Sequence, residues 1–132
     1  MSTLSVATIQ NTGSGAPVFK ESGGTEIGQI VKAWINFQGT GTVAIRDSFN
    51  FSSLTDNGTG EYTVAFSNAF SNNDFCAVAD AGGSSGIPST KIVVTDDADF
   101  STTGFRMQVL NTTGNGGVAD FNVNCIMVLG DN

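Results

Sequence analysis

The sequence predicts an all-β protein: a single antiparallel β-sandwich or jelly-roll-like domain of seven to eight strands, preceded by an extended N-terminal arm. The first observation is that helix formers are scarce, because Leu occurs only four times and no window carries apolar residues at helical spacing. The second is a regular alternation of apolar and polar residues in several short segments. The third is that clusters of Gly, Asn, Asp and Ser separate those segments, and such residues form tight turns.

The stretch 30–66 carries the clearest strand pattern in the chain. Alternate residues from 31 to 37 are apolar and predict the buried side of a strand, whereas Trp34 falls on the opposite side with Lys32 and Asn36. The run Asp56-Asn57-Gly58-Thr59-Gly60 tolerates positive φ and predicts a hairpin turn. The apolar positions that share a side within these strands are Val31, Ala33, Ile35 and Phe37, then Val43 and Ile45, then Phe49 and Phe51, then Tyr62, Val64 and Phe66.

Four later segments, 75–80, 91–95, 105–110 and 119–129, also predict strands. In the last one, apolar residues alternate with Asp and Asn until the pattern becomes apolar on both sides. We therefore expect the end of this strand to be buried on both faces or paired with another subunit. The alternating positions are Ala119, Phe121, Val123, Cys125 and Met127, and the two-sided end comprises Ile126, Val128 and Leu129.

Residues 1–28 differ from the domain expected over 29–132, because they are rich in Gly, Ser and Thr and cannot bury much of their own surface. Two interpretations remain open: a disordered terminus, or an arm that becomes ordered against another protein. The second assigns the few apolar residues of the arm to an anchor that attaches the domain to a larger particle. These candidate anchor residues are Leu4, Val6, Ile9, Val18 and Phe19.

The composition argues against several classes of partner. The net charge is −7 and the five basic residues are scattered singly, so the sequence predicts no nucleic-acid binding. No apolar run approaches the roughly 20 residues that span a bilayer, and no signal peptide is recognisable, so we expect no membrane contact and synthesis in a cytoplasm. Cys76 and Cys125 lie inside strand-like runs and are expected to be buried thiols rather than a disulfide.

The sequence contains no His, which removes the usual catalytic triads, the commonest general base and most catalytic zinc sites. The Asp96, Asp97 and Asp99 cluster, like Asp56 with Asn57, could supply oxygen ligands to calcium, but neither has EF-hand spacing. Both are more typical of surface turns. We therefore expect a protein without catalytic residues, metal ligands or cofactors.

Trp34 is the candidate recognition residue, because its ring lies opposite the apolar side of its strand. An amphipathic ring in that place serves either a subunit contact or a sugar-stacking platform, and we favour the subunit contact. Together with the two-sided end of the last strand, it predicts a homo-oligomer, with a trimer as the expected stoichiometry. The expected interface residues are Trp34, Ile126, Val128 and Leu129.

The segment KAWINFQGTGTVAIRDSFNFSSLTDNGTGEYTVAF resembles a stretch of marine phage virion proteins, especially cyanophage proteins of the tail-fibre type, and STLSVATIQNTGSGAPVF is similar to the stretch preceding it there. The resemblance is specific over 28–66, moderate over 2–20 and weak over 67–132. It implies a non-catalytic structural protein of the virion that is assembled in the host cytoplasm, joins other virion proteins through its arm and acts in host attachment.

The position on the particle stays open, because fibres are usually longer than this chain. A capsid decoration or cement protein is the first alternative, and a carbohydrate-binding module is the second. If the protein recognises a glycan or a protein of the host surface, the loop 81–90 is the best candidate, since loop changes leave a core intact. The candidate receptor-facing residues in it are Ser84, Ser85, Ile87 and Ser89.

Overall fold

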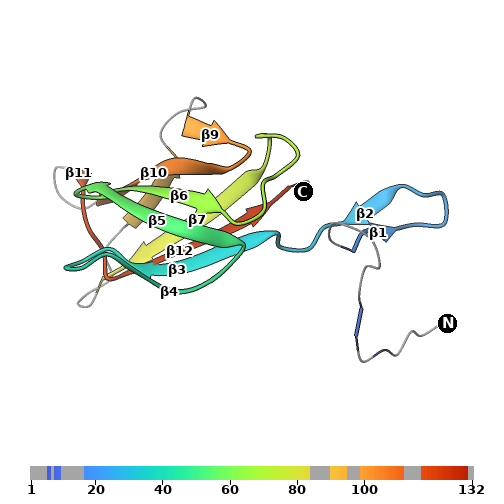
Figure 1. Cartoon of the computed structure of the whole chain (residues 1–132), viewed down its shortest axis with the longest axis horizontal. Coiled ribbons are helices and arrows are strands. Elements are labelled where there is room, and N and C mark those ends of the chain that lie inside the picture. Colours follow the sequence, from blue (N-terminus) through green and yellow to red (C-terminus); the bar gives the residue numbers. More distant parts are fainter. Residues whose placement is uncertain are drawn as a thin grey trace. The chain divides into compact units, whose positions relative to one another are not determined.

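A computed structural model of the chain describes residues 6, 8–9, 17–83, 90–94, 99–111 and 117–130. The chain divides into two compact units, Met1–Ile30 and Val31–Asn132, so the division falls two residues after the position expected from composition. Figure 1 labels the strands of both units except β8. The all-β prediction is confirmed, because the larger unit consists of antiparallel sheets whose apolar sides pack on each other.

The smaller unit contains a two-stranded antiparallel hairpin, formed by β1 (Phe19–Lys20) and β2 (Glu26–Gly28). Its turn is closed by backbone hydrogen bonds from Glu21 N to Thr25 O and from Gly24 N to Glu21 O, with Gly24 at a φ of 85°. Every residue from 18 to 30 is exposed within the described structure. A hairpin that buries none of its side chains is marginally stable by itself, so packing against another surface would stabilise it.

The first sheet of the larger unit has four strands in the order β4-β3-β12-β7. These strands are β3 (Ala33–Gln38), β4 (Ala44–Phe49), β7 (Cys76–Gly82) and β12 (Val123–Leu129). β12 therefore lies between β3 and β7, so distant parts of the sequence pair directly. A bulge between Asn36 and Phe37 shifts the register of β3 against β4.

The second sheet follows the order β11-β10-β6-β5, with β8 and β9 also paired to β10. Its strands are β5 (Phe51–Gly58), β6 (Glu61–Phe66), β8 (Thr90–Val94), β9 (Phe100–Ser101), β10 (Gly104–Asn111) and β11 (Gly117–Val118). The two units thus contain more strands than the seven to eight expected, because short ladders such as β9 and β11 have no sequence pattern long enough to recognise. The predicted hairpin turn is present, and Gly60 in it has a φ of 67°.

The core lies between the two sheets and is formed by the alternate residues that point inward from each strand. Ala33, Ile35 and Phe37 of β3 are buried, as their alternation predicts, and so is Tyr62 of β6. Phe66 lies at the centre of an aromatic cluster at one end, with its ring centroid 4.6 Å from that of Phe70 and 5.1 Å from that of Phe51. Aromatic pairs at such distances add to the free energy gained by burial alone.

One residue, Asn50, connects the two sheets between the end of β4 and the start of β5. Its φ of 58° is the only positive value at a non-glycine residue among those described. The side chain compensates for this conformation: its Oδ1 accepts from Asn68 N at 2.7 Å, and its Nδ2 donates to Lys32 O at 3.1 Å. Asn tolerates the left-handed region better than other residues with a Cβ, so this corner suits it.

The prediction that the two cysteines are buried is wrong. Cys76 and Cys125 are free and exposed, because each occupies an outward-facing position on its strand. In the ladder between β7 and β12, Cys125 lies opposite Asp80, four residues along the strand from Cys76. Four strand residues span about 13 Å, which is too far for a disulfide within one chain.

Candidate functional site

An unusual surface lies on the outer face of the β4-β3-β12-β7 sheet, the side that points away from the core. Strand register places Trp34 directly opposite Phe49 on one side and Met127 on the other, and Met127 opposite Val78. Directly paired residues share a face, so these four side chains form one continuous line across the sheet, which we name the apolar row. Phe49, Trp34, Met127 and Val78 are 55%, 37%, 45% and 57% exposed.

A groove of about 410 Å³ runs over this face beside the apolar row. Trp34, Met127 and Val78 contribute its walls, and the strand backbone at Ile35, Ala79 and Ile126 also lines it. Most of the lining residues are apolar. The polar ones are Asn36, Asp80 and Cys125.

The rows on either side of the apolar row, two residues away along the strands, differ in chemistry. On one side, the register aligns Asp47, Asn36, Cys125 and Asp80. Here Asn36 Nδ2 donates to Cys125 Sγ at 3.3 Å, while Asn36 Oδ1 is buried and has no hydrogen-bond partner among the described residues. On the other side, Cys76 pairs with Leu129. Lys32 precedes β3, and its backbone N donates to Val128 O at 3.0 Å, so it does not continue the regular register.

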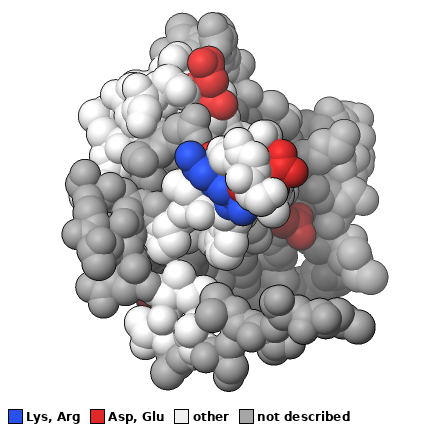
Figure 2. Space-filling model, turned by 90° about the vertical axis from the view of Figure 1, so that its right-hand side faces the viewer, with Lys and Arg blue, Asp and Glu red and all other residues white. Residues whose placement is uncertain are grey.

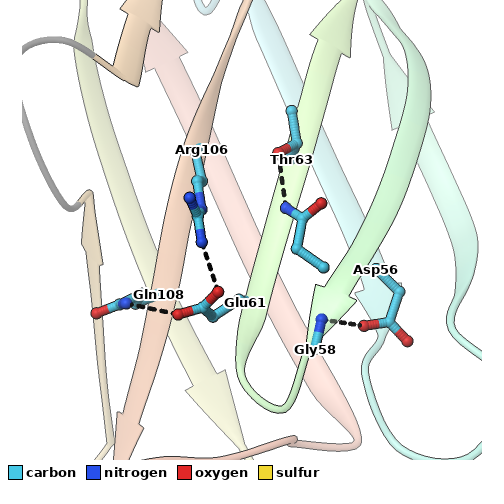
Figure 3. A network of polar contacts seen from close by, with 7 residues as sticks. Asp56, Gly58, Glu61, Thr63, Arg106 and Gln108 are labelled. Carbon is cyan, nitrogen blue, oxygen red and sulfur yellow. Dashed lines mark hydrogen bonds and ion pairs between the residues drawn. The ribbon is translucent and has the colours of Figure 1, made fainter.

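The outer face of the second sheet is different, because its polar side chains bond to one another. Arg106 donates to Glu61 at 2.5 Å, and Gln108 Nε2 donates to the other carboxylate oxygen of Glu61 at 2.8 Å (Figure 3). The hydrogen bond from Arg106 is the main reason that the pKa of Glu61 lies below its ordinary value of 4.5. On the neighbouring strands, Asn57 Nδ2 donates to Thr63 Oγ1 at 2.7 Å.

A polar cluster around Tyr62, Gly60 and Asp120 is part-buried. Tyr62 Oη donates to Asp120 Oδ1 at 2.7 Å, and the same oxygen accepts from Gly60 N at 2.7 Å. Burial, followed by the hydrogen bond to Asp120, raises the pKa of Tyr62 well above its usual value of 10.0. A Cβ at Gly39 would lie 2.4 Å from Tyr62 Oη, so only glycine fits against the cluster here. We assign this cluster a structural role.

Of the expected interface residues, Trp34 and Leu129 occupy outward positions on the sheet. The assignment of Ile126 and Val128 to a subunit interface is wrong, because they are 3% and 0% exposed and pack between the two sheets. Residues with almost no exposed surface in a single chain cannot contact a second one. The inward and outward sides of β12 are the reverse of those expected. The side chains of Cys125 and Met127 face outward, and that of Asn124 faces inward.

The anchor and loop candidates are placed only in part. Val6, Ile9, Val18 and Phe19 are exposed, and Leu4 lies outside the described residues. The candidate receptor-facing residues Ser84, Ser85, Ile87 and Ser89 also lie outside them. Sequence reasoning missed Phe49, Met127 and Val78 as surface residues. The available signal was the two-sided apolar end of the last strand, which requires one of its two sides to face outward.

No site for metal chemistry is visible in the described part of the chain, where no group of three His, Cys, Asp or Glu side chains converges. Asp56 Oδ1 instead accepts from Gly58 N at 3.0 Å within its turn (Figure 3), and Asp96 and Asp97 lie outside the described residues.

Among the described residues, no helix is long and apolar enough to cross a membrane. On the face shown in Figure 2, the coloured side chains are few, and basic and acidic ones lie close together.

Comparisons with known proteins give no relative. No protein-family model matches the chain, and neither a curated protein nor a solved structure is significantly similar to it.

Proposed function

We propose that this chain is a non-enzymatic structural protein of a bacteriophage virion, a tail-fibre or appendage component that assembles with other subunits and serves host attachment. The resemblance of residues 28–66 to virion proteins of the tail-fibre type supports the virion setting. The observation that carries the proposal is the apolar row, because a domain whose core is already complete gains nothing from four exposed apolar side chains on one face.

The chemistry of the outer face suits assembly. Trp and Met are enriched where protein surfaces meet, and a tryptophan near the centre of a contact commonly contributes much of the binding energy. Trp34 lies within the row, between Phe49 and Met127. The polar row that contains Asp47, Asn36 and Asp80 would form the wetter rim of such a contact.

The smaller unit supports the same proposal by a separate route. Val18, Phe19, Ile27 and Ile30 are all exposed in or beside the hairpin, which has no core of its own. Apolar side chains on so small an element are best accounted for by a second surface that covers them. We assign the arm to attachment of the domain to neighbouring virion proteins.

Immunogold electron microscopy of phage particles with an antibody against the purified protein tests the proposal. Label at the tail or its appendages is the expected result. Label spread over the head would instead favour the capsid decoration alternative. Complete absence of label from particles that carry the gene would contradict a virion role.

A carbohydrate-binding module is the second candidate, and one observation favours it. Trp34 borders the groove together with Asn36 and Asp80, and an aromatic ring beside amide and carboxylate groups is the usual chemistry of sugar recognition. The mainly apolar lining speaks for the assembly function instead. A glycan array that compares the wild type with Trp34→Ala distinguishes the two, because only the sugar-binding function predicts a signal that the substitution removes.

A further inference from the structure

We propose that the groove beside the apolar row receives an arginine side chain from a neighbouring virion protein, with Asp80 as the carboxylate that pairs with its guanidinium. Apolar residues next to that arginine in the partner lie along the apolar row. The inference rests on the proposed function and deepens it by naming the chemistry of the segment that covers this face.

The groove combines apolar walls with a polar end. Trp34, Met127 and Val78 of the apolar row line it, and Asn36 and Asp80 line it from the neighbouring row. Its volume of about 410 Å³ lies within the range of roughly 300–1,000 Å³ that is common for ligand sites. The groove therefore suits a group that is apolar along its length and polar at its tip.

The polar atoms that remain open at this end are hydrogen-bond acceptors. Asn36 Nδ2 already donates to Cys125 Sγ at 3.3 Å, and Asn36 Oδ1 has no donor among the described residues. Asp80, which lies directly opposite Cys125 on β7, adds a carboxylate, and a carboxylate only accepts. The matching tip therefore carries N–H donors and a positive charge.

No cation of this chain occupies that place within the described structure. Asp80 Oδ1 accepts from Ala81 N at 2.9 Å, and neither an ion pair to Asp80 nor a basic residue in the groove wall is present among the described residues. Arg46 lies on β4, at the other edge of the sheet, and donates to Gln38 Oε1 at 3.4 Å and to Asn122 Oδ1 at 3.0 Å. Three strand spacings, about 14 Å, separate β4 from β7, and charges in water are screened over about that distance.

An arginine matches the groove better than other cations do. Its planar guanidinium can donate two parallel hydrogen bonds to one carboxylate, and its stem packs on apolar surface. From Asp80 the stem would cross Cys125 toward Trp34, and guanidinium groups and their stems stack well on indole rings. A metal ion would need several ligands, and no group of three His, Cys, Asp or Glu side chains converges among the described residues.

The apolar row continues past the groove, which indicates an occupant larger than a small molecule. Phe49 is exposed at the β4 end of the row and is not among the residues that line the groove. The row crosses three strand spacings, about 14 Å, which is the length of about four residues of extended chain. The net charge of −7 also favours a basic partner. The occupant is therefore a protein segment with its arginine at the β7 end and apolar side chains toward β4.

Titration of the full chain with two blocked peptides tests the inference. One peptide is acetyl-Leu-Ser-Leu-Ser-Arg-amide, and the other carries citrulline, the uncharged analogue of arginine, in the last position. Fluorescence reports on the groove directly, because Trp34 is the only Trp of the chain. The Kd of the arginine peptide should be lower than that of the citrulline peptide by about tenfold or more, since only arginine forms a charge-assisted bond. Equal Kd values, or no binding of the arginine peptide up to about 10 mM, would overturn the inference.

Two variants locate the charge that the peptide recognises. Asp80→Asn keeps an acceptor for Ala81 N but loses the negative charge, so the two peptides should bind it equally. Asp74→Asn makes the same change in the loop before β7 and should keep the full difference between the peptides. Circular dichroism checks that both variants are folded. A difference that persists in Asp80→Asn would show that the peptide responds only to the overall acidity of the chain, and the assignment to Asp80 would be wrong.

The two exposed thiols give a second measurement. Cys125 lines the groove, whereas Cys76 lies four residues from Asp80 along β7. With the arginine peptide at about ten times its Kd, alkylation of Cys125 by N-ethylmaleimide should slow about tenfold, while that of Cys76 should change less than about twofold. An unprotected Cys125 would overturn the location of the site. Label on particles in the immunogold experiment would still support the virion function in that case, so the two proposals can fail separately.

Discussion

The outer faces of the two sheets follow the same alternation of inward and outward residues but carry different side chains, polar on one and apolar on the other. Both sheets send alternate residues into the shared core and the others outward. On the β5-β6-β10 face, the outward residues Glu61, Arg106 and Gln108 bond to each other. On the β4-β3-β12-β7 face, the corresponding central positions hold the apolar row. The β5-β6-β10 face is therefore stabilised by its own polar contacts, whereas the β4-β3-β12-β7 face exposes apolar side chains.

A sheet face that meets water normally gains from polar side chains, because they keep the surface soluble and discourage association. The second sheet follows that pattern with cross-strand pairs such as Asn57 with Thr63. The first sheet departs from it along the apolar row, which crosses all four strands, while the row beside it carries Asp47 and Asp80. A continuous apolar row beside a polar one is typical of surfaces that bind other proteins.

The largest expected effect concerns the inner side of the last strand. Ile126→Ala removes buried side-chain volume between the sheets and should lower the free energy of unfolding by about 2–5 kcal/mol. Urea denaturation followed by fluorescence measures it. If the change weakened only association and left the unfolding midpoint in place, Ile126 would belong to an interface after all.

Trp34→Ala, on the outer side of β3, should weaken association of the subunits more than it lowers the free energy of unfolding. Association should weaken by about 2–4 kcal/mol, as expected for an aromatic residue at an interface centre. The unfolding free energy of the dissociated chain should change far less, because the inward residues of β3 remain in place. Light scattering and a melting curve on the same sample separate the two quantities. A mutant that melts much lower yet stays fully assembled would place Trp34 in the role of a core residue.

The smallest effect belongs to the polar face. The Arg106 hydrogen bond lowers the pKa of Glu61, so the charged carboxylate stabilises the folded state above the ordinary value of 4.5, and this stabilisation is lost as the pH falls through the lower folded pKa. Arg106→Ala should reduce that loss. Unfolding midpoints at pH 7 and pH 3 measure the difference, and Lys20→Ala serves as a control for removing a positive charge. An equal pH dependence in wild type and Arg106→Ala would contradict the assignment.

The sequence pattern predicted the inward and outward sides correctly where one strand lies between two turns. The alternation from Ala33 to Phe37 predicted both the buried side of β3 and the outward direction of Trp34. The same reasoning failed in the last strand, because Phe121 is buried in the segment before β12 rather than within the ladder. Counting alternation through that segment inverted the side assigned to Met127.

Two further differences between the expected and the observed side of a residue have local causes. Phe49 and Phe51 are two residues apart, yet Phe49 is exposed and Phe51 is buried. Alternation holds only within one sheet, and the chain changes sheets at Asn50 between them. Asn124 points into the core although it is polar, and its Nδ2 donates to Phe121 O at 2.9 Å. A composition-based expectation cannot anticipate a buried amide that is held by backbone carbonyls.

The hydrogen bonds at Asn50 also determine which parts of the domain unfold together. Its side chain and backbone bond to Lys32, Ser67 and Asn68, so one residue ties the start of β3, the end of β4, the start of β5 and the segment after β6. Neither sheet can open at this end without breaking bonds that also hold the other. The amide protons on both sides of the corner should therefore exchange with heavy water at a common rate, as a single cooperative unit.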